Sequence, residues 1–159
     1  MTAYKAVVIT ASNRAAAGVY EDRSGPVIVS WLSERGFSVS SPVVVPDGEP
    51  VRAALVSAVE SGADLVLTTG GTGINPTDGT PEATRAVVDY EVPGLADVIR
   101  MSGWPRVPGS VLSRGVAGVA GRTLIVNLPG STGGVKDGLD VLASVVDHAL
   151  DQLRGGDHR

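Results

Sequence analysis

The sequence predicts an α/β protein, a three-layer α/β/α sandwich built around a mostly parallel central sheet. Two observations predict it: short apolar runs alternate with segments of helical periodicity along the chain, and the run DLVLTT at 64–69 has no polar face. Alternation of strand and helix produces parallel strands joined by crossovers, and a strand without a polar face suits burial on both sides. We expect 159 residues to form one domain over 1–153, followed by a flexible tail at 154–159.

The chain opens with a strand, a helix and a second strand. Ala6-Val7-Val8-Ile9 is a short apolar run. Residues 26–35 carry apolar side chains in the i, i+1, i+4, i+5 spacing of a buried helix face, and Gly36 ends this helix. Residues 37–45 predict the second strand, which Pro46-Asp47-Gly48 ends with a turn sequence.

A helix, a strand and another helix follow. The segment 50–61 has Pro50 in its first turn, where the missing N–H costs nothing, and an apolar residue at every fourth position. The strand at 64–69 comes next. A new helix opens at Thr80-Pro81-Glu82-Ala83-Thr84, whose threonine cap and early glutamate suit the positive end of a helix dipole.

The last third of the chain is less regular. We expect a helix over 95–101, whereas 102–121 carries many Gly and Pro and predicts no clear element. RTLIVNL at 122–128 is a clear strand, and Pro129-Gly130-Ser131 turns it into a closing helix over 135–153.

Composition excludes several classes of function. Thirteen Lys and Arg against seventeen Asp and Glu give a formal net charge of −4, whereas a general nucleic-acid binder needs a basic face. The sequence has no cysteine, which excludes a disulfide scaffold, a thiolate nucleophile and a cysteine zinc site. Its two histidines, His148 and His158, leave little from which to build a metal site or a catalytic triad. We interpret His148, within a helix with apolar neighbours, as structural.

The chain shows no signal for membrane insertion or export. No segment approaches the ~18 uninterrupted apolar residues of a membrane span. The sequence also opens directly into a strand-like run, without a basic and apolar leader. We therefore expect a cytoplasmic protein that acts on small molecules and binds neither nucleic acid nor membrane.

Polar and glycine-rich segments follow the expected strands at their carboxyl ends, where open α/β sheets bind ligands. We expect these four segments to converge on one rim of the sheet. They are Ser12-Asn13-Arg14, Asp47, Thr69-Gly70-Gly71-Thr72-Gly73 and Asn127-Leu128-Pro129-Gly130-Ser131.

The sharpest signal is TTGGTG at 68–73. Its glycines let the backbone approach a ligand and turn several N–H groups toward an anion such as phosphate, and its threonines add hydroxyl donors. A glycine turn that only redirects the chain explains the same residues equally well. The loop lacks the Walker lysine, and Pro76 stands where a dinucleotide fingerprint has its third glycine. A Walker ATPase and a Rossmann dehydrogenase are therefore both poor fits.

Two aspartates, Asp47 and Asp78, add carboxylates near this loop. Either could simply hold a turn through backbone N–H groups. Beside a phosphate loop, however, they suit Mg²⁺, which takes one or two carboxylates plus substrate phosphates. Ser131 or Thr132 could cap the closing helix, whose first turn would then make a second anion or nucleotide site.

Three arginines in the irregular part of the chain, Arg100, Arg106 and Arg114, could each clamp a phosphate, although a surface arginine is more often only solvated. Histidine and lysine, the usual nucleophiles of nucleotidyl transfer, are nearly absent. The residues therefore favour in-line transfer between two bound substrates, without a covalent intermediate.

The order of these segments resembles the MogA and MoaB family of molybdenum-cofactor biosynthesis proteins, which includes the G domains of gephyrin and its plant counterparts. The resemblance runs from about Lys5 to Leu153. The matching motifs are Ser12-Asn13-Arg14, Gly18-Val19-Tyr20-Glu21-Asp22, Val45-Pro46-Asp47, the loop at 69–73, Asp78-Gly79-Thr80-Pro81-Glu82-Ala83-Thr84, Glu91-Val92-Pro93-Gly94, Leu112-Ser113-Arg114 and Leu128-Pro129-Gly130-Ser131.

The resemblance implies a molybdopterin adenylyltransferase, which moves AMP from Mg·ATP to the terminal phosphate of molybdopterin and releases pyrophosphate. It also implies a homotrimer. By motif match, Asp47 and Asp78 are the catalytic, Mg²⁺-binding carboxylates. The pterin-phosphate residues would be Thr69, Gly70, Gly71, Thr72, Gly73, Ser113 and Arg114, and the nucleotide-binding residues Ser12, Pro129, Gly130 and Ser131.

The sequence departs from the family pattern at two positions. Asn13 stands where the family often has aspartate, and Gly79 where many members carry a larger residue. The alternative to an active enzyme is a non-catalytic molybdopterin-binding protein of the MoaB type. A third possibility is a domain of this fold that binds nucleotides alone.

Overall fold

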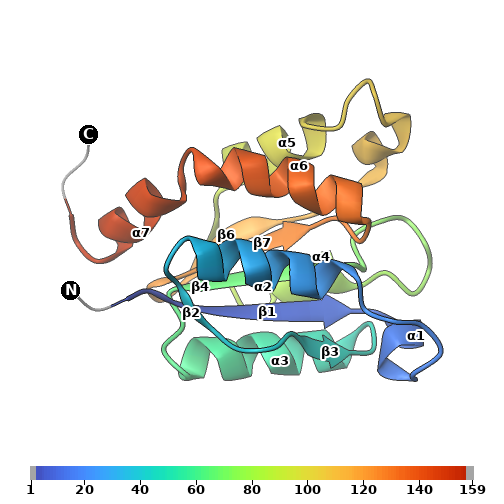
Figure 1. The fold of residues 1–159 in the computed structure, drawn as a ribbon, viewed down its shortest axis with the longest axis horizontal. Coiled ribbons are helices and arrows are strands. Elements are labelled where there is room, and N and C mark those ends of the chain that lie inside the picture. Colours follow the sequence, from blue (N-terminus) through green and yellow to red (C-terminus); the bar gives the residue numbers. More distant parts are fainter. Residues whose placement is uncertain (1–2, 157–159) are drawn as a thin grey trace.

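The computed structural model describes residues 3–156 and shows a seven-stranded, mostly parallel sheet with helices on both faces (Figure 1). The strand order is β2-β1-β4-β7-β6-β5. β3 also pairs with β1, at the end of β1, whereas β2 pairs with its beginning. β6 runs antiparallel to both β7 and β5. The strands are β1 (Lys5–Ala11), β2 (Ser38–Val39), β3 (Val43–Val45), β4 (Leu65–Thr69), β5 (Tyr90–Glu91), β6 (Ala117–Ala120) and β7 (Thr123–Leu128).

The helices form two layers, which confirms the predicted α/β/α sandwich. α2, α5, α6 and α7 bury apolar side chains against one face of the sheet, whereas α3 and α4 cover the other. Figure 1 shows α5 and α6 side by side above the sheet and α3 below it. The helices are α1 (Asn13–Ala16), α2 (Ser24–Glu34), α3 (Glu49–Glu60), α4 (Thr80–Arg85), α5 (Pro93–Met101), the 3₁₀ helix η1 (Pro108–Leu112), α6 (Thr132–Ala143) and α7 (Val146–Leu153).

The two central strands carry the packing of both layers. Every residue of β4 and of β7 is buried, as expected for strands that have helices on both sides. Ile9, Val66 and Ile125 pack toward α3, whereas Val8, Leu67 and Val126 pack toward α2 and α6. Alternate residues of one strand thus serve two separate cores.

The strand predicted at 37–45 is in fact two short strands. β2 pairs with the beginning of β1 and β3 with its end, with 40–42 between them. Pro42 lacks the N–H that a continuous ladder needs, so pairing stops and restarts.

The segment 102–121, for which no element was predicted, contains η1 and β6. Alanine and glycine make up most of β6 and hide its strand character, and at Gly118 the packing leaves no room for a side chain. A Cβ on Gly118 would lie 2.7 Å from the Tyr90 carbonyl oxygen.

The closing helix predicted over 135–153 is also divided, into α6 and α7. The Ser144 hydroxyl donates to the Val141 carbonyl at 2.8 Å, a bond that competes with the helical ladder at the break. His148 on α7 is exposed, with its Nε2 2.6 Å from the side-chain nitrogen of Gln152. His148 thus lies within a helix, as expected, but its side chain points to solvent, and its structural role stays a prediction.

The beginning of the expected tail is held against the domain. The Arg154 guanidinium lies 4.0 Å from the centre of the Tyr4 ring and 3.3 Å from Asp64. Residues 157–159, including His158, lie outside the described part of the chain. None of the helices that the structure describes is long and apolar enough to cross a bilayer.

Candidate functional site

The carboxyl ends of β1, β4 and β7 meet at one rim of the sheet. The strands are parallel and in register, with Thr10 opposite Thr69 and Thr69 opposite Leu128. The loops that follow them are therefore neighbours, as predicted. β3 ends beside Ala11, and the Asp47 backbone N–H donates to Asn13 Oδ1 at 2.9 Å, which brings Asp47 to the same rim.

The glycines of the loop after β4 are required by geometry. Gly70 and Gly71 have φ values of +89° and +70°, in the left-handed region. A Cβ on Gly70 would collide with the Ala11 carbonyl oxygen, and one on Gly71 would collide with Thr80 Oγ1 and lie 2.6 Å from Asp47 Oδ1. Only glycine lets this backbone pass between β1, α4 and Asp47.

Buried hydroxyl groups hold this loop in place. Thr80 donates its hydroxyl to the Gly70 carbonyl at 3.0 Å and its backbone N–H to the Gly71 carbonyl at 3.1 Å. Thr69 donates its hydroxyl to the Pro129 carbonyl at 2.6 Å, which ties the loop to the turn after β7. The Thr69 proton that we expected to serve a ligand is therefore used within the protein.

The turn after β7 presents the first turn of α6. Ser131 is the N-cap of α6, and its hydroxyl oxygen accepts the Gly134 N–H at 3.1 Å. A Cβ on Gly130 would lie 3.4 Å from the Gly70 Cα, so the two glycine loops are in contact. Backbone N–H groups of a helix start next to a second glycine loop suit an anion.

Asp47 and Asp78 form a pair of carboxylates at this rim. Asp47 Oδ1 is buried and has no hydrogen-bond partner among the described residues. Burial raises the pKa of Asp47, the negative charge of Asp78 raises it further, and a hydrogen bond from the Asn13 backbone lowers it in part. Asp78 Oδ2 accepts the Asn75 N–H at 3.3 Å and lies 2.8 Å from the Cβ position of Gly73.

The two carboxylates fit a divalent cation bound together with phosphate. The unpaired Asp47 Oδ1 and the repulsion from Asp78 would both be relieved by a cation. Across the described residues no group of three or more His, Cys, Asp or Glu side chains could hold a metal. Such a cation would therefore need oxygens from water or substrate, as Mg²⁺ commonly does.

Arg114 stabilises the site through hydrogen bonds to the glycine loop, to Asp78 and to α4. Its guanidinium donates to the Gly73 carbonyl at 2.9 Å, to the Asp78 carbonyl at 3.2 Å and to Glu82 Oε2 at 2.8 Å. The bond from Arg114 also lowers the pKa of Glu82. The guanidinium thus links the glycine loop to the first turn of α4.

The other two arginines proposed as phosphate clamps are also ion-paired. Arg100 pairs with Asp97 and donates to the Gly115 carbonyl at 2.7 Å, and Arg106 pairs with Asp137 at 2.7 Å. As the structure stands, none of the three arginines is free to act as an unpaired phosphate clamp. Each would first have to exchange a carboxylate partner.

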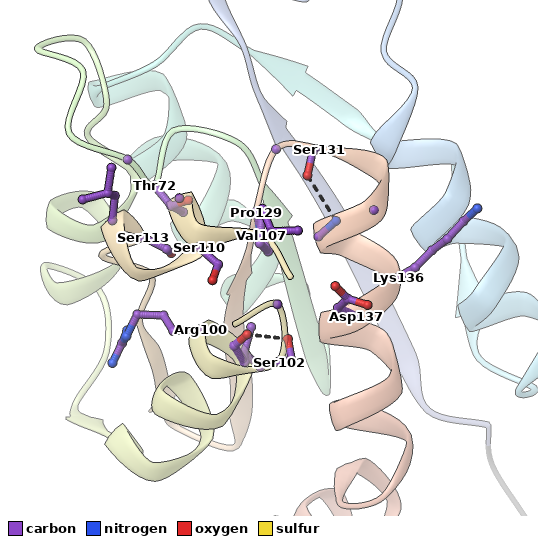
Figure 2. Close-up of a pocket in the computed structure, with 18 of the residues that line it drawn as sticks. Thr72, Arg100, Ser102, Val107, Ser110, Ser113, Pro129, Ser131, Lys136 and Asp137 are labelled. Carbon is purple, nitrogen blue, oxygen red and sulfur yellow. Dashed lines mark hydrogen bonds between the residues drawn. The ribbon is translucent and has the colours of Figure 1, made fainter. Parts of the chain in front are cut away.

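Gly130 lines both a larger and a smaller cavity at the rim. The larger, of about 880 Å³, lies between the α5–η1 segment and the start of α6 and is of ligand size (Figure 2). Of the predicted site residues, its lining includes Gly71, Thr72, Gly73, Asp78, Ser113, Pro129, Gly130 and Ser131. The smaller, of about 130 Å³, is lined by Ser12, Thr69, Gly70 and Gly130 among others.

This grouping differs from the predicted division between pterin and nucleotide residues. Pro129 and Ser131, predicted for the nucleotide, line the same cavity as Gly73 and Ser113, predicted for the pterin. Ser12 lies apart from them, in the smaller cavity. Asp47 and Arg114 are among the lining residues of neither.

The larger cavity contains polar residues to which sequence reasoning gave no role. Ser102, Ser110 and Asp137 line it, and Figure 2 shows Ser110 on η1 and Asp137 on α6 facing the same space. The Ser110 hydroxyl oxygen is buried without a partner among the described residues. The segment around Ser110 has no periodicity, so no pattern could have indicated its orientation.

The two departures from the family pattern are both compatible with the site. Asn13 Oδ1 accepts the Asp47 N–H, and a carboxylate oxygen could accept this bond equally well. At Gly79 an added Cβ would lie 3.7 Å from the Gly48 Cα, which is ordinary contact, so a larger residue also fits.

A parallel sheet that brings two glycine loops and two aspartates to one rim, beside a cavity that both loops line, is typical of proteins that bind phosphate-bearing small molecules. The family model described as a probable molybdopterin binding domain matches residues 7–148, and the chain belongs to this family.

Individual relatives agree. A molybdopterin adenylyltransferase from Pyrococcus furiosus is 41% identical over 156 residues, which cover 95% of this chain and 92% of that protein. A molybdenum cofactor biosynthesis bifunctional protein from Synechococcus elongatus is 39% identical over 96% of this chain, which spans only 48% of its length. The solved structure of the molybdopterin biosynthesis Mog protein from Mycobacterium ulcerans is 62% identical, with a TM-score of 0.93 over 98% of this chain and 99% of that chain.

Proposed function

We propose that this chain transfers AMP from ATP to the terminal phosphate of molybdopterin, as a step in molybdenum cofactor biosynthesis. The observation that carries the proposal is the buried Asp47 Oδ1, which has no partner within residues 3–156 and lies beside the charge of Asp78 and the glycine loop. This arrangement concentrates negative charge that a cation carrying phosphate would neutralise. The name of the Pyrococcus furiosus relative supports the same reaction.

The reaction needs no covalent intermediate on the protein. An oxygen of the molybdopterin phosphate attacks the α-phosphorus of ATP, the bond from that phosphorus to the bridging oxygen of the β-phosphate breaks, and pyrophosphate leaves. The backbone N–H groups of the two glycine loops would hold the phosphates in line, which is the main catalytic requirement. Asp47 and Asp78 would hold Mg²⁺, which supplies charge neutralisation for the phosphates.

We place the phosphate ends of the two substrates at Gly130, which lines both cavities. The pterin would occupy the larger cavity, with its phosphate near Gly71, Thr72 and Gly73. The smaller cavity is too small for a whole nucleotide, so it would receive phosphate beside Ser12 and Gly70 while the nucleoside lies outside. A reaction that consumes ATP also favours the cytoplasm as its location.

Pyrophosphate release from purified protein, molybdopterin and Mg·ATP tests this proposal. Asp47→Asn and Asp78→Asn should each retain the fold and lose about 100-fold or more in rate, because each removes a charge with little change of shape. Asp140→Asn, on the exposed side of α6, is the matched control and should keep full activity.

Other outcomes identify the alternatives. Full adenylylation by both site variants would overturn the proposed mechanism. Tight molybdopterin binding without pyrophosphate would identify a non-catalytic binding protein, and ATP binding without molybdopterin binding would identify a nucleotide-binding domain.

A further inference from the structure

Asp137 has no role in the phosphate chemistry described above, yet its carboxylate lies in the larger cavity. The side chain projects from α6 and is 27% exposed. Oδ2 accepts a hydrogen bond from the Arg106 guanidinium at 2.7 Å. Within residues 3–156, Oδ1 has no hydrogen-bond or ion-pair partner. Oδ1 is thus available to accept hydrogen bonds from a ligand in the cavity. Lys136, next to Asp137, extends away from the cavity (Figure 2).

The surroundings of Asp137 suit a flat heterocycle. Ile99, Val107 and Leu112 contribute apolar surface to the same cavity, and Ser110 adds a buried hydroxyl that has no partner in the described part of the chain. The Ser102 hydroxyl donates to the Ile99 carbonyl at 2.6 Å, so its proton is not available to a ligand. An apolar slot with few polar groups is the usual design of a site that orients a ring.

The two rings that the proposed reaction brings to the protein present different hydrogen-bonding edges. The 2-aminopyrimidin-4-one edge of a pterin offers two adjacent donors, N3–H and the 2-amino group. Adenine offers one donor, the 6-amino group, next to the lone pair of N1. A carboxylate has two acceptor oxygens and no donor, so it pairs with the pterin edge and repels the adenine N1.

Building on the proposed function, we propose that Asp137 selects the pterin ring by accepting its N3–H and 2-amino hydrogens. Each carboxylate oxygen has two lone pairs, so Oδ2 can accept from the ligand and from Arg106 together. Arg106 then acts as a positioning residue that fixes the orientation of the carboxylate.

Two small probes that differ in the group on C2 of the ring test this role in the whole protein without ATP. 6-Hydroxymethylpterin has the 2-amino group, whereas 6-hydroxymethyllumazine has an oxygen there, which an Asp carboxylate repels. Titration followed by ligand fluorescence, at a mildly acidic pH where both rings are neutral, should show a preference of roughly 30-fold or more for the pterin. Asp137→Asn should remove or reverse it, because an amide can accept N3–H and donate to the 2-oxo group. Asp140→Asn should keep the wild-type preference.

The outcomes separate this inference from the proposed function. A wild-type protein that binds the two probes equally, or binds neither, overturns the role of Asp137. The same holds if Asp137→Asn keeps the wild-type preference, even where adenylylation proceeds normally. If the wild type prefers the pterin but releases no pyrophosphate with complete substrates, the proposed transfer fails and the assignment of Asp137 stands.

Discussion

The buried Oδ1 of Asp47 has no hydrogen-bond partner among the described residues, and Asp78 places a second negative charge nearby. Both features work against folding, because they disfavour the ionised carboxylate in the native protein. In the unfolded chain the same carboxylate is hydrated and far from Asp78. The site therefore holds a local cost in stability that a bound cation would relieve.

We predict that Asp47→Asn stabilises the protein at neutral pH while removing its activity. Because the pKa of Asp47 is raised in the folded state, the folded protein binds this proton more tightly than the unfolded chain. The stability contributed by Asp47 therefore falls as pH rises from the ordinary aspartate pKa through the raised one. Asparagine does not ionise, so the Tm of Asp47→Asn at neutral pH should exceed that of the wild type by roughly 1–3 °C. In acid, where Asp47 is protonated, this difference in Tm should disappear.

Thermal unfolding as a function of pH measures this effect. Added Mg²⁺ should raise the Tm of the wild type and leave that of Asp47→Asn nearly unchanged. A variant that is less stable than the wild type at neutral pH would contradict the assigned electrostatics.

How far single site residues could be predicted depends on where they lie. Asp47 and the glycines of the loop follow recognisable strands, and parallel topology places all strand ends of one direction at one rim. Asp137 sits within a helix, where its acidic side chain matches the ordinary pattern of an exposed face. That α6 turns it toward a cavity depends on α5 and η1, which approach from distant sequence.

The same distinction holds for secondary structure elements. The strand predicted at 64–69 is observed as β4, because a short apolar run between turn residues is typical of a buried strand. β6 was missed because it is short and rich in alanine and glycine, and its Gly118 is required by the close approach of the Tyr90 backbone. Contacts with distant parts of the chain determine where such elements form, and the pattern of a single segment does not contain this information.

The left-handed glycine turn after β4 provides a prediction at this scale. Gly71→Ala should destabilise the protein by about 1–2 kcal/mol for the left-handed backbone and about 1–3 kcal/mol more for the clash with Thr80 and Asp47. Gly36→Ala is the matched control, since its φ is +87° but an added Cβ meets nothing within 4 Å. It should lose only the backbone contribution and keep its activity.

Urea unfolding measures both variants. Equal losses of stability in Gly71→Ala and Gly36→Ala would show that the space around Gly71 is not restricted. Adenylylation by Gly71→Ala at the wild-type rate, under conditions where it remains folded, would show that the loop does not position phosphate.

For the whole molecule, a net charge of −4 is unfavourable for binding two anionic substrates. The conflict is resolved by local donors, since backbone N–H groups and a cation held by two aspartates act over a few ångströms. The remaining feature at this scale is exposed apolar surface. Tyr90 and Val98 are 56% and 55% exposed and line an apolar groove of about 570 Å³ between α5, β5 and the α6–α7 segment.

We predict that this groove is part of a homotrimer interface, together with Trp104 and Val107 near the larger cavity, which are 47% and 50% exposed. Apolar patches of this kind mark contacts between protein chains. Light scattering coupled to gel filtration should give three times the mass of the chain. Val98→Glu should reduce it to the mass of one chain, because a charge buried in an apolar contact costs several kcal/mol.

Val43→Glu is the matched control, since Val43 is also exposed but lies on β3, on the opposite edge of the sheet. It should keep the wild-type mass. A wild type that elutes as a single chain at micromolar concentration contradicts the trimer. Dissociation by Val43→Glu but not by Val98→Glu would instead move the interface to the β3 edge, because the charge would then be buried there.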